Sequence, residues 1–100
     1  MAQMIVFYKT PQDPAAFDKY YVATHIPLAK TIPGLRKYEV SRGPVTTPFG
    51  PSPYRLVATL HFDNMQAMQS AFASPEGRAA GADAQSMADL EILLFDNHEV

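Results

Sequence analysis

The order of apolar and polar positions predicts four strands and two helical regions along the chain. The strands are expected where aromatic and β-branched residues cluster or alternate between turn formers, at residues 3–9, 35–42, 54–62 and 90–96. The first helix is expected to start at Pro14 with Asp13 as its cap. The second is expected to start after Asp63 or Asn64. The order is therefore strand, helix, strand, strand, helix, strand.

The first helical region has an apolar stripe that a proline interrupts. The predicted inward stripe is Phe17, Tyr21, Thr24, Leu28 and Ile32. Tyr20 and His25 are expected on the two shoulders of this stripe. Because Pro27 cannot donate a hydrogen bond to the Ala23 carbonyl, we expect a kink or break near His25 and Ile26.

Two other segments stand out by composition. Residues 43–53 hold four of the nine prolines, which predicts a long loop without strand pairing. The second helical region should bury Met65, Met68 and Phe72 and restart at Ser74. Its last part, residues 77–88, has few large side chains, so we expect it to pack closely and also to open readily as a lid.

The predicted order of elements is typical of an α+β, ferredoxin-like βαββαβ fold. In this fold four mainly antiparallel strands form one sheet and both helical regions cover one face. The first and last strands are apolar on both faces, whereas a sheet with one solvated face should alternate. We therefore expect a homodimer through the helix-free sheet face, which would form a dimeric α/β barrel. The alternative is a monomer that tolerates an apolar surface.

Composition limits the function classes. A chain of 100 residues suits a single domain spanning residues 1–100. Its net charge of −2, without runs of either sign, gives no support for nucleic-acid or membrane binding. The absence of cysteine excludes disulfides and thiolate chemistry. The N-terminal segment lacks the pattern of a signal peptide, so we expect a cytoplasmic protein.

Histidine is the side chain best suited to move protons near neutral pH, and His25 is the strongest candidate. Tyr21 or Tyr20 would supply a phenolic donor beside it. Alternatively, the imidazole only satisfies carbonyls that the kink leaves free. His61 lies on the face of its strand opposite Leu56, so it need not share a cavity with His25. With Asp63 it forms a possible metal fragment, although Asp63 is the more natural helix cap.

No HExxH, EF-hand, GxGxxG, P-loop or nucleophile-elbow motif occurs, so we expect neither a metal site nor an organic cofactor. A cavity between helices and sheet would suit a small apolar ligand. Its candidate ligand-binding residues are Phe17, Leu28, Met68, Phe72 and His61. The aromatic and methionine residues among them, at helical spacing, are also what an ordinary core requires.

Three segments of the sequence resemble the EthD family, which is named for a protein of ethyl tert-butyl ether degradation. They are MIVFYKTPQDPAAFDKYYVATHIPLAK, IPGLRKYEVSRG and HFDNMQAMQSAFASPEGRAAGADA. The resemblance implies a ferredoxin-like fold whose dimer joins two sheets into a barrel. It also implies that His25 corresponds to the histidine of the family's THxPL motif. Some relatives are associated with dehydration or decarboxylation, and others with cofactor-free oxygenation.

The first functional hypothesis is a cofactor-free lyase or isomerase in degradation or secondary metabolism. It would act on a small apolar or aromatic carbonyl compound, with His25 as the proton-transfer group. The only carboxylate near it on the same helix is Asp18, which is too far along the chain to touch it. The second hypothesis is a non-catalytic ligand-binding or accessory protein for a partner oxygenase system. A third, a haem or oxygen-using barrel, would require an axial ligand.

Overall fold

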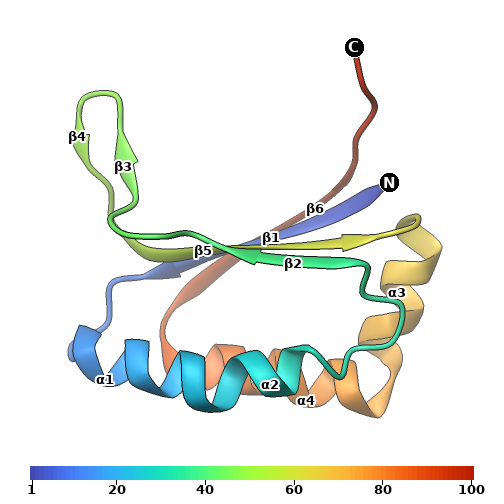
Figure 1. Cartoon of the computed structure of the whole chain (residues 1–100), viewed down its shortest axis with the longest axis horizontal. Coiled ribbons are helices and arrows are strands. Elements are labelled where there is room, and N and C mark those ends of the chain that lie inside the picture. Colours follow the sequence, from blue (N-terminus) through green and yellow to red (C-terminus); the bar gives the residue numbers. More distant parts are fainter.

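The computed structural model describes residues 1–100 and contains a four-stranded sheet with all helices on one face (Figure 1). The strands of this sheet are β1 (Ala2–Lys9), β2 (Lys37–Val40), β5 (Tyr54–Phe62) and β6 (Leu90–Asp96). Their spatial order is β2-β5-β1-β6, and every neighbouring pair is antiparallel. This order confirms the predicted ferredoxin-like fold.

In Figure 1, α1, α2 and α4 run beneath the sheet, and α3 stands steeply at its right-hand end. They are α1 (Pro14–Tyr20), the π-helical turn η1 (Tyr21–His25), α2 (Ile26–Ala29), α3 (Met65–Ala73) and α4 (Pro75–Met87). As predicted, Asp13 caps α1 with its side chain, and Ser74 caps α4. None of these helices has the length and hydropathy of a segment that spans a bilayer.

The cap of α3 settles an alternative that the sequence left open. The Asn64 side chain accepts a hydrogen bond from the Ala67 amide at 2.7 Å, so Asn64 is the cap. The prediction that Asp63, rather than binding a metal, is a helix cap is therefore wrong. Asp63 instead accepts two hydrogen bonds from the Arg36 guanidinium, at 3.0 and 2.9 Å, and this pairing lowers the pKa of the Asp63 carboxyl.

The predicted kink near His25 is a π-helical turn rather than a break. The Ile26 amide donates to the Tyr21 carbonyl, five residues earlier, just before Pro27 interrupts the normal hydrogen-bond series. A π turn holds one residue more than an α turn, so the inward-facing positions after Tyr21 fall one residue later than in the predicted α-helical stripe. His25 is therefore buried and Thr24 is exposed, which corrects the predicted stripe.

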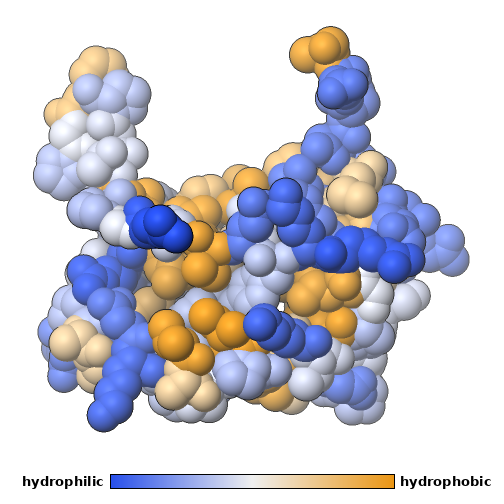
Figure 2. All heavy atoms as spheres, viewed as in Figure 1, coloured by the Kyte–Doolittle hydropathy of each residue, from blue (hydrophilic) through white to orange (hydrophobic).

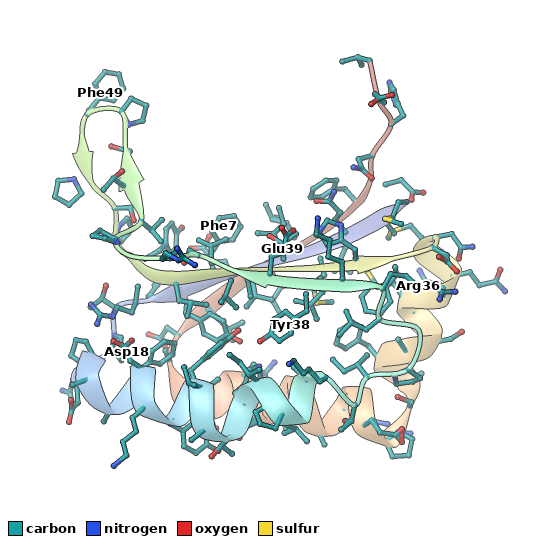
Figure 3. The ribbon with its side chains drawn as sticks, in the orientation of Figure 1. Phe7, Asp18, Arg36, Tyr38, Glu39 and Phe49 are labelled. Atoms are coloured by element: carbon teal, nitrogen blue, oxygen red, sulfur yellow. The ribbon has the colours of Figure 1, made fainter.

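Residues 43–53 include strand pairing that the sequence did not predict. They contain a short hairpin, with β3 (Thr46–Thr47) antiparallel to β4 (Gly50–Pro51). Gly50 has a φ of 139°, a conformation that favours glycine and lets the chain reverse. The hairpin projects from the sheet on its helix-free side, and Phe49 at its tip is 99% exposed (Figures 1 and 3). The expectation of a loop without strand pairing is therefore wrong.

The two faces of the sheet differ because successive strand residues point in opposite directions. On the helix-covered face, the strands contribute seven of the fifteen buried hydrophobic core residues: Ala2, Met4, Val6, Tyr8, Ala58, Leu60 and Phe62. On the other face, the register aligns Ile5 with Leu93 of β6, and Phe7 with Val57 of β5. Figure 3 shows Phe7 and Glu39 pointing away from the helices and Tyr38 pointing toward them.

Helices α3 and α4 meet closely where α4 begins. A Cβ atom placed on Gly77 would lie 2.1 Å from the Ala71 carbonyl oxygen and 2.7 Å from the Phe72 Cα. Both contacts are to backbone, so the neighbouring helix would have to shift. By contrast, nothing lies within 4 Å of a Cβ placed on Gly81, one turn further along α4. The first glycine is therefore required by packing, and the second is not.

We therefore expect opposite effects from the same substitution at these two glycines. Gly77→Ala should lower the free energy of unfolding by about 2 kcal/mol or more, because overpacking against backbone forces the helices apart. Gly81→Ala should raise it by about 0.5–1 kcal/mol through helix propensity. Urea titrations at one fixed protein concentration would measure both changes. Equal effects in the two variants would contradict the close approach of α3 and α4.

Candidate functional site

A small cavity lies between the sheet and the helices. Its volume is about 80 Å³, and most of its lining is apolar. The apolar wall includes Val6 and Leu60 from the strands and Ile32 and Phe72 from the helical side. Four polar-tipped side chains also line it: Tyr8, Tyr21, His25 and Tyr38. An apolar pocket with a few grouped polar atoms is the usual form of a small-molecule site.

His25 enters this site because of the π turn. The residue is 5% exposed, and its Nδ1 lies 2.9 Å from Oδ2 of Asp83 on α4. An ionised carboxylate only accepts, so Nδ1 carries the proton when the imidazole is neutral. The other oxygen of Asp83 accepts a hydrogen bond from the Tyr20 hydroxyl at 2.5 Å, and this bond raises the pKa of Tyr20. Asp83 is therefore fixed from two sides.

The second ring nitrogen of His25 is the one available for chemistry. Nε2 lies 3.5 Å from the Tyr8 hydroxyl, at the limit of a hydrogen bond. Tyr8 lines the cavity and Asp83 does not, so Nε2 is on the cavity side of the ring. In the tautomer that Asp83 favours, Nε2 carries no proton, and its lone pair is held only by the long contact with the Tyr8 hydroxyl. This nitrogen can accept a proton from a ligand in the cavity.

Tyr21 and Tyr38 form a second polar pair. Their hydroxyl oxygens are 2.6 Å apart, one residue coming from η1 and the other from β2. Burial is the main cause that raises the pKa of Tyr8, Tyr21 and Tyr38. The three phenols therefore stay protonated at neutral pH. One of Tyr21 and Tyr38 donates its hydrogen to the other, so this pair has one hydroxyl hydrogen left for an oxygen atom that gains negative charge. Tyr8 can donate to such an atom if it leaves Nε2 of His25.

The structure places the predicted catalytic residues in two groups. His25 and Tyr21 line the cavity, with ring centroids 5.0 Å apart. Tyr20 is 40% exposed and reaches the site only through Asp83, so its hydroxyl does not face a ligand in the cavity. No buried side-chain polar atom in the protein lacks a hydrogen-bond partner. A ligand must therefore replace an existing bond, and the long contact between Tyr8 and His25 is the weakest.

Of the residues predicted to bind a ligand, only Phe72 lines this cavity. Phe17 packs its ring against Tyr8 and Tyr21, with centroids 5.5 and 5.8 Å apart. Met68 is fully buried, and Leu28 is half-buried against the core. These three positions have the burial expected of ordinary core residues.

His61 lies on the opposite face of the sheet from His25. Its Nε2 is 2.9 Å from an oxygen of Glu39, and its side chain is 12% exposed. Because Asp63 is paired with Arg36, His61 and Asp63 have separate partners. The structure brings no group of three His, Asp or Glu side chains together that could hold a metal ion.

Sequence reasoning missed Asp83, Tyr8 and Tyr38. On the first helical region, Asp18 pairs with Arg55 rather than with His25, in line with its expected distance from the imidazole. The carboxylate that contacts His25 is Asp83, from the second helical region. Strand alternation did contain a signal, since it put Tyr8 on the buried face with Met4 and Val6. Asp83 left only a weak signal: it follows the buried Ala80 by three positions, and so lies near its face of α4.

The fold and this cavity define a ferredoxin-like α+β protein with a buried histidine–carboxylate pair beside a small, mostly apolar cavity. Residues 9–91 match the EthD domain. The chain belongs to the EthD family. This confirms the family inferred from its sequence segments.

Two relatives and one structural neighbour are similar to this chain over nearly its whole length. An uncharacterised 11.0 kDa protein of Rhodococcus erythropolis, from the thcB-thcC intergenic region, is 36% identical over 99% of this chain and 96% of its own. An EthD family protein of Bacillus halodurans is also 36% identical, with a TM-score of 0.90 over 98% of this chain and 99% of its own. SnoaB of Streptomyces nogalater, a cofactor-independent oxygenase, has a TM-score of 0.70 at 15% identity, over 99% and 94% of the two chains. This last similarity shows the fold alone.

The contact between His25 and Asp83 predicts a fixed tautomer. In the wild-type protein at a pH where the imidazole is neutral, we expect His25 to be protonated at Nδ1. Asp83→Ala should shift the population toward the Nε2-protonated form, because the acceptor for Nδ1–H is lost. Long-range ¹H–¹⁵N spectra measure the ratio. Tyr20→Phe, which keeps the carboxylate, is the control and should not change it; an Nε2-protonated wild type would contradict the assignment.

Proposed function

We propose that the protein is an acid/base enzyme of the lyase or isomerase type that needs no metal or organic cofactor. Its substrate would be a small apolar carbonyl compound. The observation that supports this most is the buried pair of His25 and Asp83, with Nε2 on the cavity side. A histidine whose other nitrogen is held by a carboxylate is a common arrangement for a general base.

The proposed reaction starts with removal of a proton from the carbon next to the carbonyl group. Nε2 of His25 accepts this proton, and Asp83 stabilises the imidazolium that results. The carbonyl oxygen gains negative charge in the same step. The hydroxyls of Tyr8, Tyr21 and Tyr38 are the available donors for that oxygen. Returning the proton to another atom gives an isomerisation, and loss of a leaving group gives an elimination.

The size of the cavity limits what can react there. Its volume of about 80 Å³ is roughly half that of a cavity known to hold one benzene molecule, about 150 Å³. Without movement of the wall, the reacting part of a substrate is therefore a small aliphatic carbonyl group. An aromatic ring beside His25 would require side chains such as Phe72 to move.

The proposed proton transfer can be tested without knowing the natural substrate. In deuterated buffer, the protein should speed exchange of the hydrogens next to the carbonyl of butanone, a small ketone, as followed by NMR. His25→Gln should lower this rate by about 10²- to 10⁴-fold, the usual contribution of a general base. His98→Gln, in the exposed C-terminal segment, is the matched control and should leave the rate unchanged.

The same experiment distinguishes the enzyme from a ligand-binding or accessory protein. A non-catalytic protein would bind the ketone, as shown by chemical-shift changes at the cavity residues, but would not speed exchange. Equal exchange rates in the wild type and in His25→Gln would also refute the proposed role of His25.

We also propose that the protein is a homodimer through the helix-free face of the sheet. The apolar residues on this face are Ile5, Phe7, Val57, Leu93 and Phe95. Leu93 is 55% exposed and Phe95 is 38% exposed, which is unusual for large apolar side chains that lie close together. In a two-fold dimer, the helix-free face of each copy would cover the helix-free face of the other, because such an interface pairs a patch with the same patch on its partner.

The dimer predicts a change in mass for one substitution. Leu93→Glu should convert a dimer into a monomer at micromolar concentration, because it places a charge within the proposed apolar contact. Thr24→Glu, an exposed position on the helix layer, should remain dimeric. Light scattering measures both, and a monomeric wild type would overturn the proposal.

A further inference from the structure

A second and much larger opening lies outside the inner cavity. This groove, of about 980 Å³, runs between the base of the β3–β4 hairpin and the helices α1 to α2. One wall is helical and includes Val22 and Ile26. The other includes Val40 and Leu56 from the sheet and residues of the hairpin segment. Figure 2 shows hydrophobic residues gathered on the surface between the hairpin and the helices.

The groove and the inner cavity share one residue, Tyr21. Its side chain lines both spaces, and its hydroxyl is held by Tyr38 at 2.6 Å. Tyr38 points from the sheet toward the helices (Figure 3). This pair of phenols therefore stands between the open groove and the imidazole of His25. Tyr21 therefore marks the point at which the two spaces adjoin.

The chemistry of the groove suits an uncharged ligand. Its charged lining residues are Asp18 and Arg55, which are hydrogen-bonded to each other. This pairing lowers the pKa of Asp18 and raises the pKa of Arg55. Their charges thus offset each other at the rim. Val22 is 66% exposed and Val40 is 40% exposed, so two apolar side chains face solvent across the groove without a partner.

We propose that this groove is the outer half of the substrate site. It would hold the apolar, uncharged body of a carbonyl compound whose small reactive end enters the inner cavity. The inner cavity is too small for such a body, and the groove is more than large enough for it. That the reactive end is a carbonyl group rests on the proposed function. The contacts of the body with Val22 and Val40 are independent of that chemistry.

Two methyl ketones of different size separate the two halves of the site. Butanone is close to benzene in volume, so only its carbonyl end enters the inner cavity, and it has no ring system to lie in the groove. In 2-acetylnaphthalene the ring system must lie in the groove. Val22→Asp should weaken binding of 2-acetylnaphthalene by about tenfold or more, since it puts a carboxylate against the ring. Binding of butanone should change by less than about twofold, because Val22 does not line the inner cavity. NMR titration of the valine and alanine methyl groups measures both dissociation constants.

Thr24→Asp is the matched control. It adds the same charge on the same helical turn, at an exposed position outside the groove, and should leave both ketones unaffected. Equal affinity of 2-acetylnaphthalene for the wild type and for Val22→Asp would overturn the proposal, as would equal weakening of both ketones.

The measurements also separate this inference from the proposed reaction. If neither ketone exchanges hydrogen for deuterium but Val22→Asp still weakens only the larger one, the groove is confirmed as a binding site and the acid/base function fails. If butanone exchanges and 2-acetylnaphthalene does not bind, the function stands and the groove is not part of the site.

Discussion

The π-helical turn at Tyr21–His25 is the feature on which the candidate site depends. Pro27 has no backbone N–H, so the helix before it is not held in the usual α-helical register. The wider turn that results keeps Tyr21 and His25 on the same inner face, four residues apart. In a regular α-helix the face would pass through Thr24, and His25 would lie at the side. A single backbone irregularity thus moves an imidazole from a helix shoulder into the core.

Burying this imidazole requires a partner, because an unpaired polar group in an apolar interior is costly. Asp83 supplies it from α4, a helix that is distant in sequence. The small buried residues of α4, including Gly77, Ala80 and Ala84, allow this helix to approach the rest of the core closely. The close packing of α4 therefore brings the Asp83 carboxylate within reach of His25. Packing and site geometry are coupled in this way.

The alternation of the strands assigns the two faces of the sheet to different tasks. On β1, Tyr8 faces the cavity while its neighbour Phe7 faces away from the helices. On β2, Tyr38 and Glu39 are divided in the same manner. The inner residues form the polar end of the cavity, and the outer ones belong to the surface proposed for association. Since the two sets lie on opposite sides of one sheet, substitutions in one need not disturb the other.

Local pattern alone predicted the order of the main elements and the fold, and it singled out His25 as a candidate site residue. Strand alternation and helix caps act over a few residues, so they are visible in the sequence. The pairing of His25 with Asp83, and of Tyr21 with Tyr38, was decided only by tertiary structure, because each joins segments that no local period relates. The short hairpin at Thr46–Pro51 was not predicted either, because prolines in this segment argue against strand pairing. These contacts depend on how the helices pack on the sheet, and the order of residues along the chain does not specify the distances between packed elements.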